Sequence, residues 1–175
     1  DTRVLANALA SLGDALRESE PGRATDLLTR SLDVNQRLDI PDGVAVATNG
    51  LARLALAEGD VPRALSLAQQ VLDLSNDSGN REGSTVAYQL LGAIHIANNE
   101  PEKAVSALDR AIQQAVEQED HSREARSRLI MAEAYVALGD LEQAATQRDA
   151  GLAAATAGRD HRTQAQLEQL RLQID

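Results

Sequence analysis

Apolar residues recur along the whole chain at the spacing of an amphipathic α helix. Neighbours three and four positions apart fall on one helical face, as the first segment illustrates. Its apolar residues are Val4, Leu5, Ala8, Leu9, Leu12, Ala15 and Leu16. The same pattern returns after each short polar break. It predicts nine helices, over residues 2–18, 21–38, 41–58, 61–76, 81–98, 101–118, 121–138, 141–156 and 161–175.

The breaks contain residues that stop one helix and start the next. All four prolines fall where a helix is predicted to begin, a place where the missing N–H costs nothing. They are Pro21, Pro41, Pro62 and Pro101. Gly59 can end a helix in the left-handed conformation, and Asn99 takes that place in the third pair. Asp60 can accept the unpaired N–H groups of the following helix, and Asp140 with Gln143 predicts a capping box.

Helices and breaks repeat every forty residues. One column is identical in each copy (Ala24, Ala64, Ala104 and Ala144), and another is aliphatic (Leu32, Leu72, Ile112 and Leu152). A fixed self-similar period of this size indicates a stacked repeat protein. We expect the alanines at close helix crossings and the aliphatic column in the core. The prediction is a single all-α domain with repeats at about 1–40, 41–80, 81–120 and 121–160 and a closing helix at 161–175.

Composition argues against several classes of function. The net charge of −10 argues against a nucleic-acid or anionic-membrane surface, which needs clustered Lys and Arg. The absence of cysteine removes disulfides and thiolate zinc sites and fits a cytoplasmic protein. No apolar run approaches the ~20 residues that span a bilayer. No methionine opens the chain, and a helical pattern begins at once, so we expect a piece excised from a longer protein.

No catalytic constellation emerges from the three histidines. His95 shares its column with Ala15, Ala55 and Tyr135, so we expect it to pack in the core. The other two each follow an aspartate at the start of a predicted helix, where capping is the expected role; they are His121 and His161. One repeat displaces them by ~10 Å, too far to share a metal whose bonds are near ~2 Å. We expect no enzyme activity, no cofactor and no metal.

The columns together resemble the tetratricopeptide repeat (TPR). A mostly small position in the first helix (Leu12, Ala52, Gly92 and Ala132) precedes a Gly-Asp break and the alanine column of the second helix. The resemblance covers essentially the whole chain and implies a right-handed α-α superhelix. The sequence departs from the family near the start of the first helix, where an aromatic residue is usual and only the third repeat has one, Tyr88. It also places Arg148 where a large apolar residue is usual.

The resemblance further implies that the first helices of the pairs line a concave groove and the second helices form its back. The family's groove positions, carried onto this frame, predict a binding surface for a protein or peptide. Its members are Asn49, Arg53, Leu56, Gln89, Ala93, Ile96, Arg126 and Glu133. The amides of Asn49 and Gln89 can hold a peptide backbone, and Arg53 and Arg126 can take a carboxylate. Alternatively, apolar groove positions such as Leu9, Leu90 and Ile130 pack against the next repeat.

Three functions fit this surface. The forty-residue period resembles that of bacterial regulators, such as antibiotic-pathway activators and large LuxR-type or maltose-type regulators. In that case the chain is the sensor of a multidomain regulator whose DNA-binding or ATPase module lies upstream. The second hypothesis is a stand-alone scaffold protein, and the third is a repeat domain attached to an enzyme. In each case the expected partner is a protein or peptide, with self-association possible and no nucleic acid or membrane.

Overall fold

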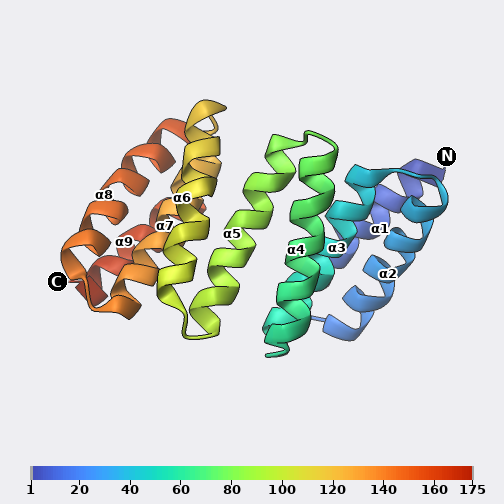
Figure 1. Ribbon diagram of the computed structural model, residues 1–175, viewed down its shortest axis with the longest axis horizontal. Helices are drawn as coiled ribbons and strands as arrows, with labels where there is room; N and C mark the ends of the chain where they lie inside the picture. The colour runs from blue at the N-terminus through green and yellow to red at the C-terminus, as the bar shows by residue number, and fades with distance from the viewer. Residues whose placement is uncertain (1, 175) are drawn as a thin grey trace. The chain divides into compact units, whose positions relative to one another are not determined.

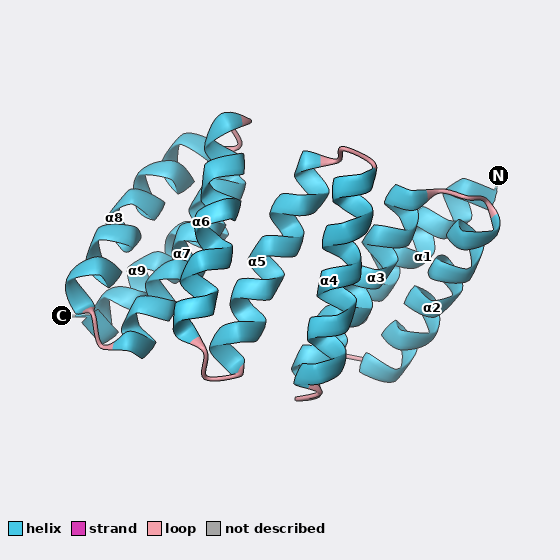
Figure 2. Ribbon diagram, viewed as in Figure 1, coloured by secondary structure: helices cyan, strands magenta, loops and turns pink. Residues whose placement is uncertain are grey.

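The chain is a succession of α helices joined by short turns (Figures 1 and 2). The structure, a computed structural model, describes residues 2–174 and leaves out the side chains of positions 172 and 173. Within this range it forms nine helices and no strand. They are α1 (Thr2–Leu16), α2 (Pro21–Arg37), α3 (Pro41–Ala57), α4 (Val61–Asp77), α5 (Arg81–Ala97), α6 (Pro101–Glu117), α7 (His121–Leu138), α8 (Leu141–Gly158) and α9 (His161–Ile174).

The predicted helices are confirmed, and no described end differs from the prediction by more than two residues. Asp175, the last residue of the predicted closing helix, lies outside the described residues. The predicted left-handed backbone conformation after a helix is also confirmed, at Gly59 (φ 78°) and Asn99 (φ 58°). Asp39, Glu119 and Arg159 adopt the same conformation without being glycine, at φ between 50° and 55°. The turn geometry therefore follows from the forty-residue frame even where the residue does not favour it.

Aspartates start four of the helices by accepting a backbone N–H three residues onward. The distance from the backbone nitrogen to the aspartate Oδ1 is 3.2 Å at Asp60, 2.9 Å at Asp120, 3.1 Å at Asp140 and 3.0 Å at Asp160. The aspartates before His121 and His161 therefore cap as predicted, and the bond from Gln143 N–H to Asp140 is one half of the expected capping box. Glu20 and Glu100 stand at equivalent starts but make no such cap bond. One extra methylene takes their carboxylates past the N–H groups and toward neighbouring cations.

The chain forms two compact units, residues 1–87 and 88–175. In the first unit, α1 packs on α2 and α3, and α3 packs on α2 and α4. Its central cluster joins Ala24 and Leu28 of α2 to Leu51 and Leu54 of α3. A Cβ on Gly13 would meet the Leu28 side chain at 2.8 Å and the Ala24 carbonyl oxygen at 3.3 Å. The first pair therefore crosses closely at the alanine column, as the sequence predicts.

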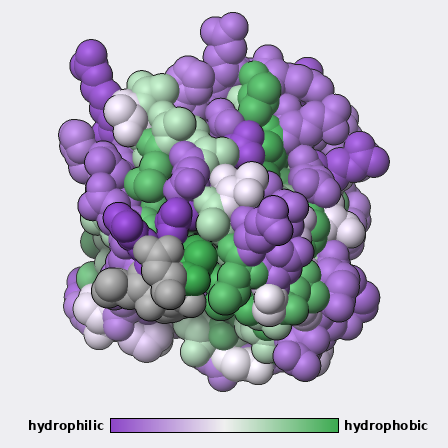
Figure 3. Space-filling model, turned by 90° about the vertical axis from the view of Figure 1, so that its left-hand side faces the viewer, coloured by the Kyte–Doolittle hydropathy of each residue, from purple (hydrophilic) through white to green (hydrophobic). Residues whose placement is uncertain are grey.

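In the second unit, α7 packs on α6, α8 and α9. One cluster joins Ala104 and Leu108 of α6 to α7, and another is closed by Leu167 and Leu170 of α9. Arg148 occupies the position of a large apolar residue; its side chain is only 13% exposed, and its guanidinium pairs with Asp149 at 2.9 Å. On the side of this unit that carries α8, polar and apolar side chains are interspersed (Figure 3).

One predicted core column is misplaced by a single residue. The four alanines of the identical column are all 0% exposed, as expected. Of the predicted aliphatic column only Leu72 is buried; the other members, Leu32, Ile112 and Leu152, are half-buried. The buried column lies one residue earlier, at Ser31, Val71, Ala111 and Gly151. One residue turns the side chain by about 100° around the helix. The small residues therefore face the close crossing, and the leucines cover its edge.

The first helix differs from its repeat equivalents in what covers it. Leu5 and Leu12 on α1 are 50% and 45% exposed, whereas their equivalents on α3, Ala45 and Ala52, are 6% and 0% exposed. On α3 this face packs on α2. Among the described residues no helix covers the corresponding face of α1. The same position of the repeat therefore carries very different packing constraints in α1 and α3.

This contrast predicts that exchanging leucine and alanine changes the stability by different amounts in α3 and in α1. Ala52→Leu should overpack the interface of α3 and lower the free energy of unfolding by about 1–3 kcal/mol. Leu12→Ala should lower it by less, because Leu12 is already 45% exposed and its truncation leaves no enclosed cavity. Urea denaturation followed by circular dichroism measures both. Equal losses for the two variants would contradict the assigned packing.

Candidate functional site

Two hollows open beside α3 in the first unit, and Val46 and Asn49 line both of them. These residues lie three positions apart, and Arg53 follows four positions later, so all three share one face of the helix. The opposite face of α3 is held in the core by Leu51 and Leu54. Two of the three groove residues predicted on this helix, Asn49 and Arg53, therefore come together on an accessible surface.

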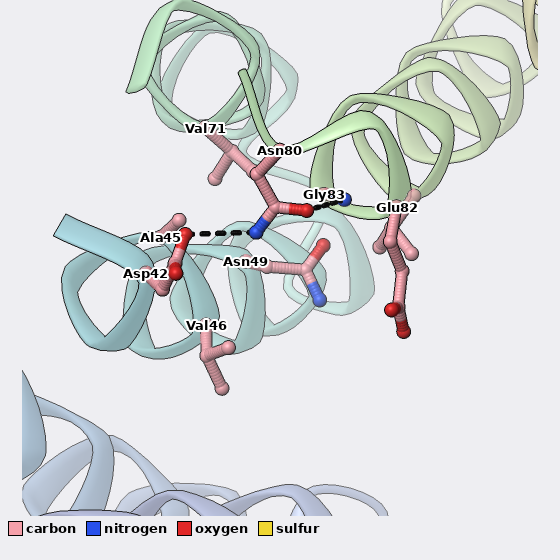
Figure 4. A pocket seen from close by; sticks show the side chains of 9 residues that line it. Asp42, Ala45, Val46, Asn49, Val71, Asn80, Glu82 and Gly83 are labelled. Carbon is pink, nitrogen blue, oxygen red and sulfur yellow. Dashed lines mark hydrogen bonds between the residues drawn. The ribbon is translucent and has the colours of Figure 1, made fainter. Parts of the chain in front are cut away.

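The α3–α5 hollow lies between the starts of α3 and α5 and encloses about 510 Å³, part of it open to solvent. Its lining combines apolar side chains with carboxylates and amides (Figure 4). The members are Asp42, Ala45, Val46, Asn49, Val71, Asn80, Glu82, Gly83 and Val86. Asn80 organises one wall, because its Nδ2 donates to Asp42 at 2.8 Å while its Oδ1 accepts from Gly83 N–H at 2.8 Å. The side-chain amide thereby ties α3 to the first turn of α5.

The α1–α3 hollow lies on the other side of Asn49 and encloses about 650 Å³, part of it open to solvent. It is lined by Ala10, Ser11, Asp14, Leu28, Val46, Asn49, Gly50 and Arg53. Asp14 at its rim pairs with Arg17 at 3.2 Å. Arg53 is half-buried and supplies the cation in the lining itself. A chain lying across α3 would thus meet carboxylates at one hollow and a guanidinium at the other.

Asn49 is the residue common to the polar part of both hollows. Its Oδ1 atom is buried, and no hydrogen-bond donor among the described residues reaches it. A buried amide oxygen without a partner costs free energy that a ligand's N–H would recover. Leu56, also predicted for the groove, is half-buried one turn beyond Arg53 and lines neither hollow.

The predicted residues on the second half of α5 make contacts within the second unit. Gln89 is 3% exposed, and its Nε2 donates to the Arg123 carbonyl at 3.0 Å and to Ser127 Oγ at 2.9 Å. Its donor hydrogens therefore join α5 to α7 and are not available to a peptide. Ala93 and Ile96 are half-buried against the α6–α7 cluster.

The packing alternative for Leu9, Leu90 and Ile130 is realised. None of the three side chains is more than 8% exposed. They belong to the interiors of their units and offer little surface to a ligand. The accessible part of the predicted groove is therefore smaller than the family's positions alone suggest.

Arg126 and Glu133 lie on α7 in the second unit. Glu133 is accessible to solvent, yet the surrounding protein desolvates its carboxylate and raises its pKa, while Arg126 acts in the opposite direction. A carboxylate can be exposed and still lose part of its hydration when protein surrounds it on several sides. The pair offers one anionic and one cationic group on the second unit.

His95 is half-buried and forms a hydrogen bond with Glu100, so it is not the fully packed core residue that the sequence suggested. Its Nδ1 lies 2.9 Å from Glu100 Oε2, and 17% of its side chain is exposed. Lys103 first, then Asn98 and His95, lower the pKa of Glu100 to about 2 by hydrogen bonding to it. Within residues 2–174 no group of three or more His, Cys, Asp and Glu side chains is placed to hold a metal ion.

Three residues of the α3–α5 hollow, Asp42, Asn80 and Glu82, were not predicted as site residues from the sequence. They stand at helix starts, where polar residues are expected for capping alone. The available signal was Asn80, which occupies the helix-start column that Asp120 and Asp160 fill in later repeats. An amide there can cap with its oxygen and still donate with its nitrogen, which a carboxylate cannot do.

The chain is similar to known tetratricopeptide repeat proteins in sequence and in fold. Residues 43–115 match the model of the tetratricopeptide repeat. Two crystal structures of a Podosopora anserina protein, described as a kinesin light chain with nearly identical TPR-like repeats, superpose with a TM-score of 0.71 each. They are 19% and 20% identical to this chain, and the match covers 99% of it and 96% of either structure. The chain has the fold of a TPR array.

A third structural neighbour is BtubC (BKLC) from P. vanneervenii, with a TM-score of 0.74 at 18% identity. The match covers 90% of this chain but only 65% of that protein, so the chain spans about two thirds of its length. No curated protein sequence matches the chain. No helix within the described part is long and apolar enough to cross a membrane.

The raised pKa of Glu133 gives a prediction with a definite sign. The folded protein binds this proton more tightly than the unfolded chain, so ionisation destabilises the fold as pH rises through the carboxylate range. Glu133→Gln should therefore raise the melting temperature at pH 7. At pH 3, where both states of the wild type are largely protonated, the two proteins should melt together. A melting temperature lowered at pH 7 would contradict the assigned desolvation.

Proposed function

We propose that this TPR array is a non-catalytic protein-binding module and that it holds an extended segment of its partner across α3. The observation that carries the proposal is Asn49, whose unpartnered amide oxygen lies between two hollows. TPR arrays in general mediate interactions between proteins. The proposal assigns that role to one surface of the first unit.

The chemistry of the surface suits a polypeptide backbone. An extended segment presents N–H and C=O groups that a side-chain amide can pair on both sides. Val46, 58% exposed between the two hollows, gives apolar side chains of such a segment something to cover. Arg53 adds a fixed cation one helical turn from Asn49. The α3–α5 hollow is mostly apolar with a few polar groups, which is the usual form of binding sites.

We further propose that the module belongs to a multidomain bacterial regulator and acts there as its sensor. The support is the forty-residue period and the sequence columns, which resemble those of such regulators. The sequence of the parent protein tests this part independently. A DNA-binding helix-turn-helix in the same polypeptide would support the regulator, and a metabolic enzyme domain such as a glycosyltransferase in its place would overturn it.

The binding surface can be tested by alanine substitutions on α3. Asn49→Ala should weaken binding by about 5- to 150-fold, because losing a buried amide partner costs about 1–3 kcal/mol. Arg53→Ala should weaken it in the same direction. Both variants should keep the helical circular dichroism signal. A peptide selected from a random display library against the immobilised protein, titrated by fluorescence anisotropy, provides the affinity.

Gln69→Ala is the matched control. Gln69 is exposed on α4, donates to Asp73 at 2.8 Å and lines neither hollow. Its loss should leave the affinity unchanged. If Gln69→Ala weakens binding while Asn49→Ala does not, the partner lies on the second helices and the α3 surface has no binding role.

A further inference from the structure

The α3–α5 hollow has a charge of one sign around an apolar floor. Its charged lining residues are Asp42 and Glu82, both exposed, and none of the nine lining residues is Lys or Arg. The apolar floor beneath the two carboxylates is formed by Val71, which is 2% exposed, and the half-buried Val86. A neutral apolar side chain would contact the two valines but would leave Asp42 and Glu82 without a charged partner from the ligand. A cation on an aliphatic stem satisfies both parts.

From this arrangement we propose that the α3–α5 hollow receives a lysine or arginine side chain of the bound segment. The inference rests on the proposed function and adds the specificity of one subsite. The aliphatic stem lies along Val46 and Val86, and the charged head lies between the two carboxylates. Asn49 then has two partners within reach, the backbone of the segment and the head group, because either cation has several N–H donors.

The anionic wall is preorganised. Asp42 accepts from Asn80 Nδ2, and Asn80 is itself fixed by the Gly83 N–H (Figure 4). A carboxylate already held in place loses less side-chain entropy when it binds a cation than a free one does. The Asn80 side chain is a neutral amide, so its bond to Asp42 brings no positive charge into the hollow. The hollow thus offers a positioned acceptor before any ligand arrives.

The neighbouring α1–α3 hollow sets the direction of the segment. Arg53 lines it and disfavours a second cation beside itself, and the one carboxylate of the lining, Asp14, is already paired with Arg17. A segment with a basic residue over the α3–α5 hollow and a carboxylate or a carbonyl group over Arg53 matches both potentials. The reverse orientation would put like charges together at both ends. Complementary charge of this kind fixes the register of a bound chain more than it adds affinity.

The experiment begins with a random nonapeptide display library selected on the immobilised protein. We expect the enriched peptides to share one Lys or Arg. A synthetic copy of an enriched peptide is then compared with the same peptide carrying norleucine in that place, which keeps the stem and removes the charge. Exposed ion pairs are weak, so norleucine should lower the affinity about two- to tenfold at low salt, and less at high salt.

Variants of the protein locate the effect. Asp42→Asn keeps an oxygen for the Asn80 hydrogen bond, and Glu82→Gln keeps the size of the side chain. Each should weaken the basic peptide about two- to fivefold and leave the norleucine peptide unchanged. Asp26→Asn removes an equal charge from the exposed surface of α2 and should change neither affinity. Thermal melting confirms that all three variants fold.

Each result decides one point. Enriched peptides without a basic residue, bound in an Asn49-dependent way, overturn the basic subsite and leave the proposed function standing. An equal loss from Asp26→Asn and Asp42→Asn also overturns the subsite, because the attraction would then be that of the whole acidic protein. Failure to enrich any peptide overturns the proposed function and the subsite with it.

Discussion

The close approach of paired helices is the constraint on which the rest of this structure depends. Each pair meets at an alanine with no exposed surface, in the identical column that begins at Ala24. A larger side chain would separate the helices, and the flanking leucines would no longer reach across. With almost no aromatic residues, the core gains its stability from many small contacts at short range. The period must therefore stay constant along the chain, since each repeat has to return the same small residue to the same crossing.

The same constraint decides which residues can bind a partner. The face of α3 that holds Leu51 and Leu54 is committed to the core, and the face that holds Val46 and Asn49 is left accessible. In the second unit, Gln89 occupies the position equivalent to Asn49 but is bound to α7. Equivalent positions of a repeat are thus not equivalent sites. The difference lies in whether a serine and a carbonyl group of the next first helix are within reach of the amide.

The sequence was sufficient to predict the helices, their caps and the TPR-like fold, because these depend on local chemistry repeated in register. It was one residue wrong about the buried column of the second helices. Periodicity defines a face about 100° wide, and side-chain size at the crossing decides which edge is buried. It also missed the Asp42–Asn80 bond, which joins residues 38 apart through the packing of two helix starts. Site chemistry of this kind depends on tertiary geometry and leaves only a capping residue as its trace in the sequence.

The central claim is that a polypeptide partner lies across the accessible face of α3. The most direct measurement is a crystal structure of this chain with a peptide selected for binding to it. The account predicts peptide backbone within hydrogen-bonding distance of the Asn49 amide and peptide side chains in contact with Val46. Peptide seated instead on the outer faces of α2 and α4, with Asn49 untouched, would contradict it.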